Sequence, residues 1–179
     1  PGEVEGITWG WQITSQINGW GIFEASSEHN YLGFAPNTSN QYDEGFDIPE
    51  PPLGASQNYI QTYFYHPEWG QSVYGDNYTQ DVRNEVPEDL PVFCDGELLL
   101  TNLQCNLIEF EVVVVSDMSG EASITFNEYS TAHAANSDTA VPVPANVYTY
   151  AEVDGTHFLI GEGTEIEFYL SEEEEKTIT

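Results

Sequence analysis

Hydrophobic and polar residues alternate along much of this 179-residue chain, and a period of two predicts β-strands. The first such segment, residues 6–14, carries apolar side chains at Ile7, Trp9, Trp11 and Ile13, with small or polar residues between them. Successive side chains of a strand point to opposite faces, so this segment has one aromatic face.

Four later segments repeat the alternation, at residues 59–65, 108–115, 122–126 and 165–170. Each has an apolar face and a more polar one, as strands of antiparallel sheets do when only one face is buried. The sequence SDMSG, residues 116–120, predicts a hairpin loop between two of these strands. Asp154-Gly155 predicts a two-residue hairpin between residues 146–153 and 156–161.

These patterns predict an all-β protein of eight or nine strands. We expect an antiparallel β-sandwich with an immunoglobulin-like or jelly-roll layout, formed by one domain over residues 1–179. No segment of ten or more residues shows a helical period. The strand order cannot be predicted from alternation alone.

Three stretches depart from the strand pattern. Residues 35–57 are rich in Pro, Gly, Asn and Asp, and their clustered prolines favour an extended path, so we expect a functional loop or an ordered cover. Residues 141–146 predict a stiff connector. Residues 171–179 predict an acidic, solvated tail, at least as far as Lys176.

Charge narrows the range of partners. Arg83 and Lys176 stand against 31 Asp and Glu, and the net charge is −29. A field of this sign repels nucleic acid and anionic lipid, so neither is an expected partner. The acids serve either as a solubilising surface in a salty medium or as specific cation sites. No apolar stretch approaches the roughly 20 residues of a membrane helix, so no membrane insertion is expected.

The two cysteines, Cys94 and Cys105, lack the spacing of a zinc site. A disulfide between them is the preferred interpretation, with two free buried thiols as the alternative, and it indicates an oxidising compartment. Asn37 and Asn77 begin Asn-x-Ser/Thr triplets compatible with glycosylation. The chain begins with Pro1 and without a signal segment, which suggests processing. We expect an extracellular or cell-surface location.

Five motifs follow one another between Tyr31 and Val115: YLG, then YDEGFDIPEPP, YFYHPEWG, YTQDVR and IEFEVVVV. This order resembles a module of large bacterial surface proteins that carry a type IX secretion sorting domain. The resemblance covers about half of the chain and implies an extracellular β-sandwich without assigned enzymatic activity. The chain departs from the pattern in the Cys94–Cys105 loop and in its acidic end.

No motif predicts catalysis. The four histidines, His29, His66, His133 and His157, show no metal-binding spacing and are interpreted as surface or packing residues. No HExxH sequence, nucleophile elbow, phosphate-binding loop or dinucleotide fingerprint is present. Among 31 acids, some pair will reach a glycosidase-like spacing by chance. We therefore predict that the chain is not an enzyme.

Calcium is the cofactor with the best support in the sequence. Four carboxylates and an amide fall within eleven residues: Asn40, Asp43, Glu44, Asp47 and Glu50. Oxygen ligands at short spacing suit calcium, which takes 6–8 of them. The alternative is a hydrated acidic loop without a bound ion. Asp76 and Asp81 form a weaker second cluster.

Two functions remain open. The first is a subunit of an extracellular filament or surface layer, a homopolymer in which residues 6–14 complete a neighbour's sheet through Ile7, Trp9, Trp11 and Ile13. The same segment may equally be the first strand of its own sheet. The second is a calcium-supported carbohydrate-binding or adhesion module that uses some of the four Trp and eleven Tyr as a platform for surface polysaccharide. The alternative for these rings is core and edge packing.

Overall fold

The computed structural model describes residues 7–19, 24–36, 38–51, 58–70, 75–84, 109–131, 143–144 and 147–179. Within these ranges the chain forms strands and no helix, which confirms the all-β prediction. The described part of the chain accordingly holds no helix with the length and apolarity needed to cross a membrane. Its eleven strands are β1 Trp9–Asn18, β2 Glu24–Ala35, β3 Ile48–Pro49, β4 Ile60–Tyr65, β5 Asn77–Asn84, β6 Val112–Ser116, β7 Gly120–Tyr129, β8 Thr149–Val153, β9 Thr156–Ile160, β10 Thr164–Leu170 and β11 Lys176–Ile178.

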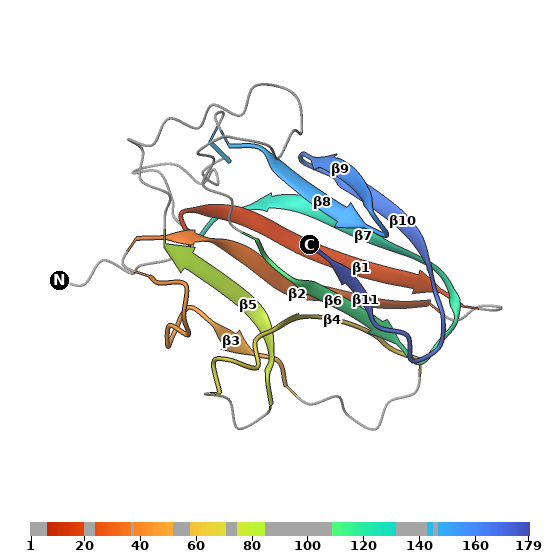
Figure 1. Ribbon diagram of the computed structural model, residues 1–179. Coiled ribbons are helices and arrows are strands. Elements are labelled where there is room, and N and C mark those ends of the chain that lie inside the picture. Colours follow the sequence, from red (N-terminus) through yellow and green to blue (C-terminus); the bar gives the residue numbers. More distant parts are fainter. Residues whose placement is uncertain are drawn as a thin grey trace.

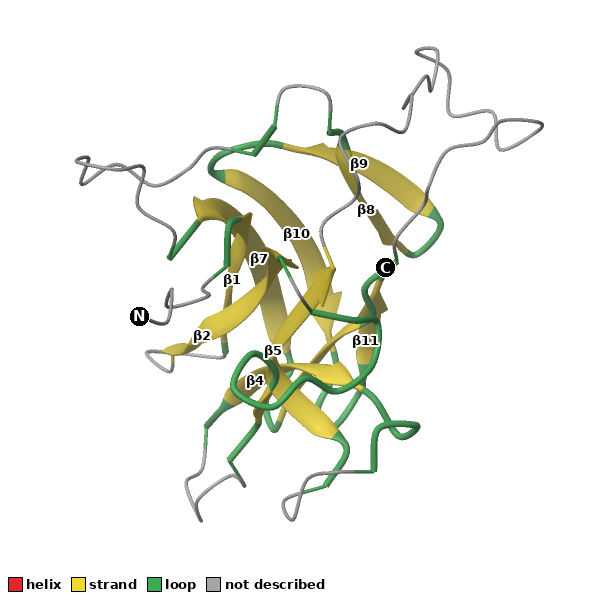
Figure 2. Cartoon of the chain, turned by 90° about the vertical axis from the view of Figure 1, so that its left-hand side faces the viewer, coloured by secondary structure: helices red, strands yellow, loops and turns green. Residues whose placement is uncertain are grey.

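Nine strands form one sheet in the order β10-β7-β1-β2-β5-β4-β6-β11, with β3 paired to β5 (Figure 1). All pairs are antiparallel except β2 with β5, which is parallel. The sheet curls into a nearly closed barrel, and the β8–β9 hairpin lies at the opening (Figure 2). Backbone hydrogen bonds of 2.7 and 3.2 Å between Glu152 and Thr179 link the hairpin to the end of β11. The layout is thus barrel-like, and only loosely the sandwich that was predicted.

The interior of the barrel is filled by the apolar faces that alternation predicts. Ile124 and Phe126 of β7 and Ile166 and Phe168 of β10 are all buried in one core cluster. The outward residues of β10 are exposed, as expected. β4 differs, because Gln61 and Tyr63 on its predicted wet face are also buried. Gln61 donates to Glu50 and Tyr63 to Glu175, so segments outside the barrel cover this face.

β1 is an interior strand of its own sheet. It pairs with β2 on one side over the length of the strand and with β7 on the other. Ile7, Trp9, Trp11 and Ile13 are buried within the molecule, with Ile13 fully inaccessible. In the single chain these four side chains belong to the molecule's own core, which is the alternative stated above, and their role in a subunit interface stays a prediction without support from this structure. A run of alternating aromatic residues describes the faces of a strand but not its partners, and here both edges are already paired.

Residues 116–120 do not close a hairpin. β6 pairs with β4 and β11, whereas β7 pairs with β1 and β10, so this turn crosses between two parts of the sheet. The Asp117 carboxylate accepts hydrogen bonds from the backbone amides of Asn58 (2.8 Å) and Tyr59 (2.7 Å), which fixes the turn to the start of β4. Gly120 is required at the far end, because a Cβ there would lie 2.2 Å from the Asn18 carbonyl oxygen.

The predicted acidic tail ends in a strand. Glu172–Glu175 are exposed, but β11 pairs with β6. Its Ile178 side chain is buried in the main core, so residues 176–178 belong to the barrel. Residues 38–51 of the Pro- and Asp-rich segment behave largely as predicted, since they contain only the two-residue strand β3 and lie along β5.

Candidate functional site

The β8–β9 hairpin forms as its sequence predicts. Asp154 and Gly155 both have positive φ angles, 50° and 75°, which is the backbone of a tight two-residue hairpin turn. Gly adopts this conformation freely and Asp tolerates it. The register pairs Val153 with Thr156 next to the turn and Thr149 with Ile160 at the far end. Ala151, Val153 and Ile160 face inward and are buried in the core, which holds the hairpin against the barrel.

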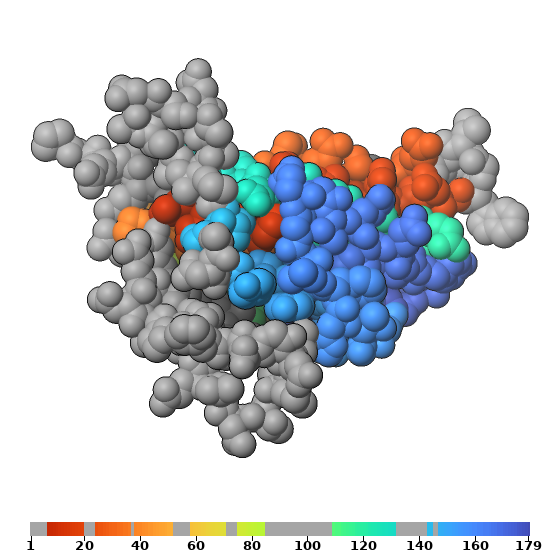
Figure 3. All heavy atoms as spheres, turned by 90° about the horizontal axis from the view of Figure 1, so that it is seen from above, coloured from red at the N-terminus to blue at the C-terminus, as the bar shows by residue number. Residues whose placement is uncertain are grey.

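The outward face of the same hairpin is apolar at its open end. Tyr148 is 62% exposed, Leu159 60% and Tyr150 44%, and we name these three residues the tyrosine platform. Tyr150 lies directly opposite Leu159 in the register, so their side chains are neighbours on one face. The hairpin and β10 form a broad surface in the space-filling view (Figure 3). The platform is therefore an exposed apolar patch on a hairpin whose other face is packed in the core.

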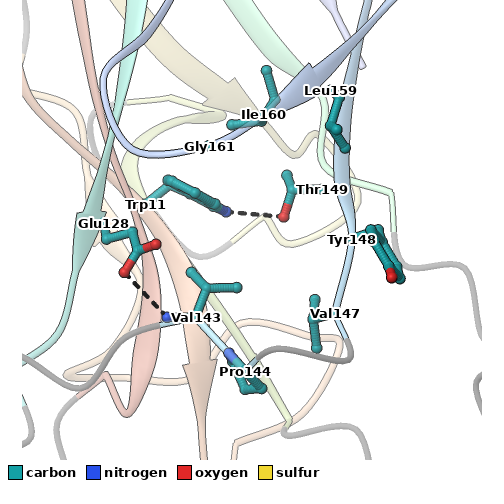
Figure 4. A pocket seen from close by; sticks show the side chains of 10 residues that line it. All are labelled: Trp11, Glu128, Val143, Pro144, Val147, Tyr148, Thr149, Leu159, Ile160 and Gly161. Atoms are coloured by element: carbon teal, nitrogen blue, oxygen red, sulfur yellow. Dashed lines mark hydrogen bonds between the residues drawn. The ribbon is translucent and has the colours of Figure 1, made fainter.

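A hollow of about 230 Å³ adjoins the platform (Figure 4). Trp11 of β1 lies within it and donates from Nε1 to Thr149 Oγ1 at 3.1 Å. Glu128 of β7 lies beside Trp11, its partner in the register of β1 and β7, and accepts from the Val143 amide at 3.4 Å. The lining residues are Trp11, Glu128, Val143, Pro144, Val147, Tyr148, Thr149, Leu159, Ile160 and Gly161. The hollow thus combines apolar walls with a few polar groups, the usual composition of a small ligand site.

The tip of the hairpin carries two polar contacts. His157 Nε2 lies 3.1 Å from Glu152 on the adjacent strand, and Lys176 Nζ lies 3.1 Å from both carboxylate oxygens of Asp154. Asp154 is 67% exposed, and pairs with a solvated partner stabilise a fold by no more than about 1 kcal/mol. The positive charge of Lys176 is thus paired with a carboxylate of the same chain, so it does not make the region of the platform positive.

A second polar centre is buried between β4 and β5. Asp81, fully inaccessible, accepts from Arg83 Nε at 3.0 Å and Nη2 at 2.8 Å. It also lies 3.0 Å from His66 Nε2, while His66 Nδ1 lies 2.8 Å from Glu68. We name His66, Glu68, Asp81 and Arg83 the histidine cluster. These residues come from HPEWG and YTQDVR, so two of the motifs that resemble the surface module meet in space.

The geometry fixes the charge state of His66. Both ring nitrogens face carboxylates, which accept but do not donate, so both nitrogens must carry protons. Burial alone would lower the pKa of His66, but the hydrogen bonds to Asp81 and Glu68 outweigh burial and raise it. Burial likewise acts to raise the pKa of Asp81, and hydrogen bonds from His66 and Arg83 outweigh it and lower the pKa. The cluster holds two cations and two anions and is neutral as a whole.

Rings surround the histidine cluster. The His66 imidazole stacks on Trp69 with centroids 3.7 Å apart, and Trp69 meets Tyr78 edge to face at 4.8 Å. The Arg83 guanidinium lies 4.5 Å from the centroid of Phe110, a cation–π contact. This packing excludes solvent and strengthens the ion pairs. The cluster therefore joins strands and loops, and none of its four residues lines the hollow beside the tyrosine platform.

The predicted calcium ligands do not converge. Asp43 accepts from the amide and hydroxyl of Ser39, and Asp47 accepts from the amides of Asp43 (2.7 Å) and Val82 (2.8 Å). Glu50 accepts from Gln61 through one oxygen, while its other carboxylate oxygen is buried without a hydrogen-bond partner. The other two predicted ligands, Asn40 and Glu44, are exposed. Among the described residues, no three His, Cys, Asp or Glu side chains form a group able to hold a metal ion.

Asp47 connects this loop to the histidine cluster. Burial raises its pKa to about 7, against the opposing effect of its hydrogen bonds from Val82 and Asp43, and the nearby charges of Asp81 and Asp43 add to the rise. Its side chain ties residues 43–47 to β5. The structure thus uses two of the predicted calcium ligands, Asp43 and Asp47, to fasten the loop to the barrel.

Several predicted residues lie outside the described ranges: Cys94, Cys105, Asn37 and His133. The disulfide stays a prediction. Asn77 is half-buried at the start of β5, where its carbonyl accepts from the Glu50 amide at 2.8 Å. His29 is exposed and His66 is buried against Trp69, which agrees with their interpretation as surface or packing residues; the two carboxylate partners of His66 were not predicted.

The alternation of residues 148–153 carries a signal for the tyrosine platform. In a strand, Tyr148 and Tyr150 fall on one face and Ala151 and Val153 on the other, so only one of the two pairs can face the core.

No family model matches the chain, nor does any curated protein or solved structure. The resemblance to the surface module therefore depends on its motif residues alone.

Proposed function

We propose that this chain is a non-enzymatic extracellular module that binds a neutral polysaccharide through the tyrosine platform. The observation that carries the proposal is the exposure of Tyr148, Tyr150 and Leu159 on one face of a hairpin whose other face is buried in the core. The backbone that carries these side chains is held by the buried face of the hairpin, so binding does not have to order it. The immunoglobulin-like or jelly-roll topology also remains a proposal.

The chemistry of the platform favours sugar rings. Tyrosine presents an apolar ring face and a hydroxyl that bonds with water or ligand, which suits the mixed apolar and polar faces of a pyranose. The adjoining hollow adds Glu128 as a hydrogen-bond acceptor for hydroxyl groups. A net charge of −29 repels anionic polymers, so an uncharged polysaccharide is the class that fits.

Self-assembly by donation of residues 6–14 is not carried forward as a function. β1 has strand partners on both edges, and its large side chains are already buried. An extracellular location is part of the proposal and derives from the sequence.

Retention on insoluble cellulose, chitin, xylan and mannan tests the proposal, with alginate as the anionic comparison. Tyr150→Ala should weaken binding roughly two- to twelvefold, because one aromatic contact is worth about 0.5–1.5 kcal/mol. Tyr65→Ala is the matched control, since Tyr65 on β4 has the same 44% exposure as Tyr150 and lies off the platform. The proposal fails if wild-type protein passes through every neutral matrix, or if the two variants lose binding equally.

A further inference from the structure

The outward face of β1 and β7 carries no charge in its middle. The register pairs Gln12 with Asn127, Thr14 with Thr125, and Gln16 with Ser123. The intervening residues of both strands, such as Ile13 and Ile124, are buried in the core, so the paired polar residues point outward. We name the following residues the uncharged face: Gln12, Thr14, Gln16, Asn18, Thr125 and Asn127; Ser123 belongs to the same row but is buried, with 7% of its surface exposed.

The composition of this face is unusual for this chain. The segment from Ile7 to Phe23 contains no charged residue, although 31 acids are spread over 179 positions. Exposed carboxylates stand at the margins of this face: Glu165 and Glu167 on β10, Glu24 and Glu28 on β2, and Glu121 of β7, which pairs with Asn18 at one end. Red, orange and turquoise atoms of β1, β2 and β7 reach the surface beside the blue atoms of β10 (Figure 3). A strip of amides and hydroxyls thus lies between two acidic borders.

The strip has the size of a binding surface for an extended chain. From Gln12 to Asn18 it runs roughly 20 Å along β1, and its two strands, β1 and β7, lie roughly 5 Å apart between the acidic strands β2 and β10. The Tyr169 ring, 54% exposed, stands at the Asn18 end, where Tyr169 pairs with Glu121 and Glu121 with Asn18. Amides and hydroxyls both donate and accept hydrogen bonds, whereas carboxylates only accept.

Charge and polarity select one occupant. A second copy of the chain would bring another −29 against the acidic borders. A basic partner would gain more on the carboxylate-rich surfaces than on this strip, and an apolar partner would leave the amides and hydroxyls without hydrogen bonds. A neutral, hydroxyl-rich chain is not repelled by the acidic borders, and it can form hydrogen bonds with the amides and hydroxyls of the strip.

We propose that the uncharged face is a second binding surface for a neutral polysaccharide, on a different part of the barrel from the tyrosine platform. This inference rests on the proposed function and extends it, because one molecule would then hold two polysaccharide chains. β10 separates the two surfaces around the barrel. One protein monomer should therefore cross-link a polysaccharide network.

Cross-linking of soluble polymer tests the second surface independently of retention. Adding protein to hydroxyethyl cellulose, xyloglucan or glucomannan should raise light scattering and viscosity for at least one of them. Gln16→Glu should abolish this rise, and it should lower retention on the insoluble matrix by roughly tenfold or more, because two linked contacts bind far more tightly than one. Gln41→Glu, the same change on an exposed loop, should behave as wild type.

Gln16→Ala supplies a second variant that removes the amide without adding a charge, and thermal melting establishes that each variant is folded. Loss of cross-linking in both Gln16 variants, with the fold intact, supports the second surface. Retention that depends on Tyr150 but not on Gln16, without cross-linking by wild type, overturns this inference and leaves the proposed function standing. Absence of retention on every neutral matrix overturns the proposed function itself.

Discussion

Replacing Asp81 by Asn should destabilise the protein more than any surface substitution, because it removes the central anion of the histidine cluster. The carboxylate accepts three hydrogen bonds, two from Arg83 and one from His66, and it is fully inaccessible. Asn keeps the shape but not the charge, so His66 and Arg83 would be left with the exposed Glu68 and with Asp47, whose pKa burial raises to about 7. Breaking a buried pair in this way costs about 3–5 kcal/mol.

Urea unfolding followed by tryptophan fluorescence measures this loss, since Trp69 stacks on His66 and reports on the cluster. The unfolding midpoint should fall by roughly 1–5 M urea, given slopes of about 1–3 kcal/mol per molar. Asp154→Asn is the matched control: it removes the solvated pair with Lys176, worth less than about 1 kcal/mol, and Asn tolerates the positive φ at this turn. Equal and small losses in the two variants would refute the view that the cluster is one coupled charged unit.

Two further outcomes follow from burial and protonation. Stability should fall as pH rises through neutrality: the raised pKa of His66 makes its contribution complete below its unfolded value of about 6.5 and lost above its folded pKa. Asp47 acts with the same sign. Its pKa is raised from 3.8 to about 7, so up to about 4 kcal/mol of folding stability is lost as the pH rises from 3.8 to about 7. Unfolding midpoints at about pH 5 and pH 8 in about 1 M NaCl, where net repulsion is screened, test this, and a higher midpoint at pH 8 contradicts it. Ile178→Ala should cost about 2–5 kcal/mol because its side chain fills the core, whereas Ile48→Ala, 47% exposed, should change the free energy of unfolding by less than about 0.5 kcal/mol; similar melting temperatures for the two would show that β11 contributes little.

Local patterns predicted the faces of strands better than their neighbours. The alternation in β7 and β10 gave the buried side correctly, since period two fixes which residues share a face. The turn at Asp154-Gly155 was predictable because its backbone suits few other residue types. Pairing is a non-local property, and nothing within residues 108–126 says that β6 and β7 join different parts of the sheet.

The candidate sites likewise depend on contacts between residues that are distant in the sequence. His66 and Asp81 are fifteen residues apart, and they meet only because β4 and β5 pair in one register. Carboxylates of residues 40–50 resembled calcium ligands in the sequence, but backbone amides compete for the same oxygens once the chain is folded. Whether Asp47 can accept from the Val82 amide depends on where Val82 lies in the fold, and the spacing of residues 40–50 carries no information about that position.

The confinement of both basic side chains to strands also bears on proteolysis. Arg83 and Lys176 are the only points at which a protease of trypsin-like specificity can cut this chain. Arg83 lies in β5 and Lys176 in β11, each hydrogen-bonded to a neighbouring strand, so cleavage at either point requires local opening of the barrel. The long segments between the strands offer such an enzyme no cleavage site. In a medium rich in trypsin-like enzymes, the lifetime of the protein should therefore follow the stability of the barrel, whatever the conformation of its loops.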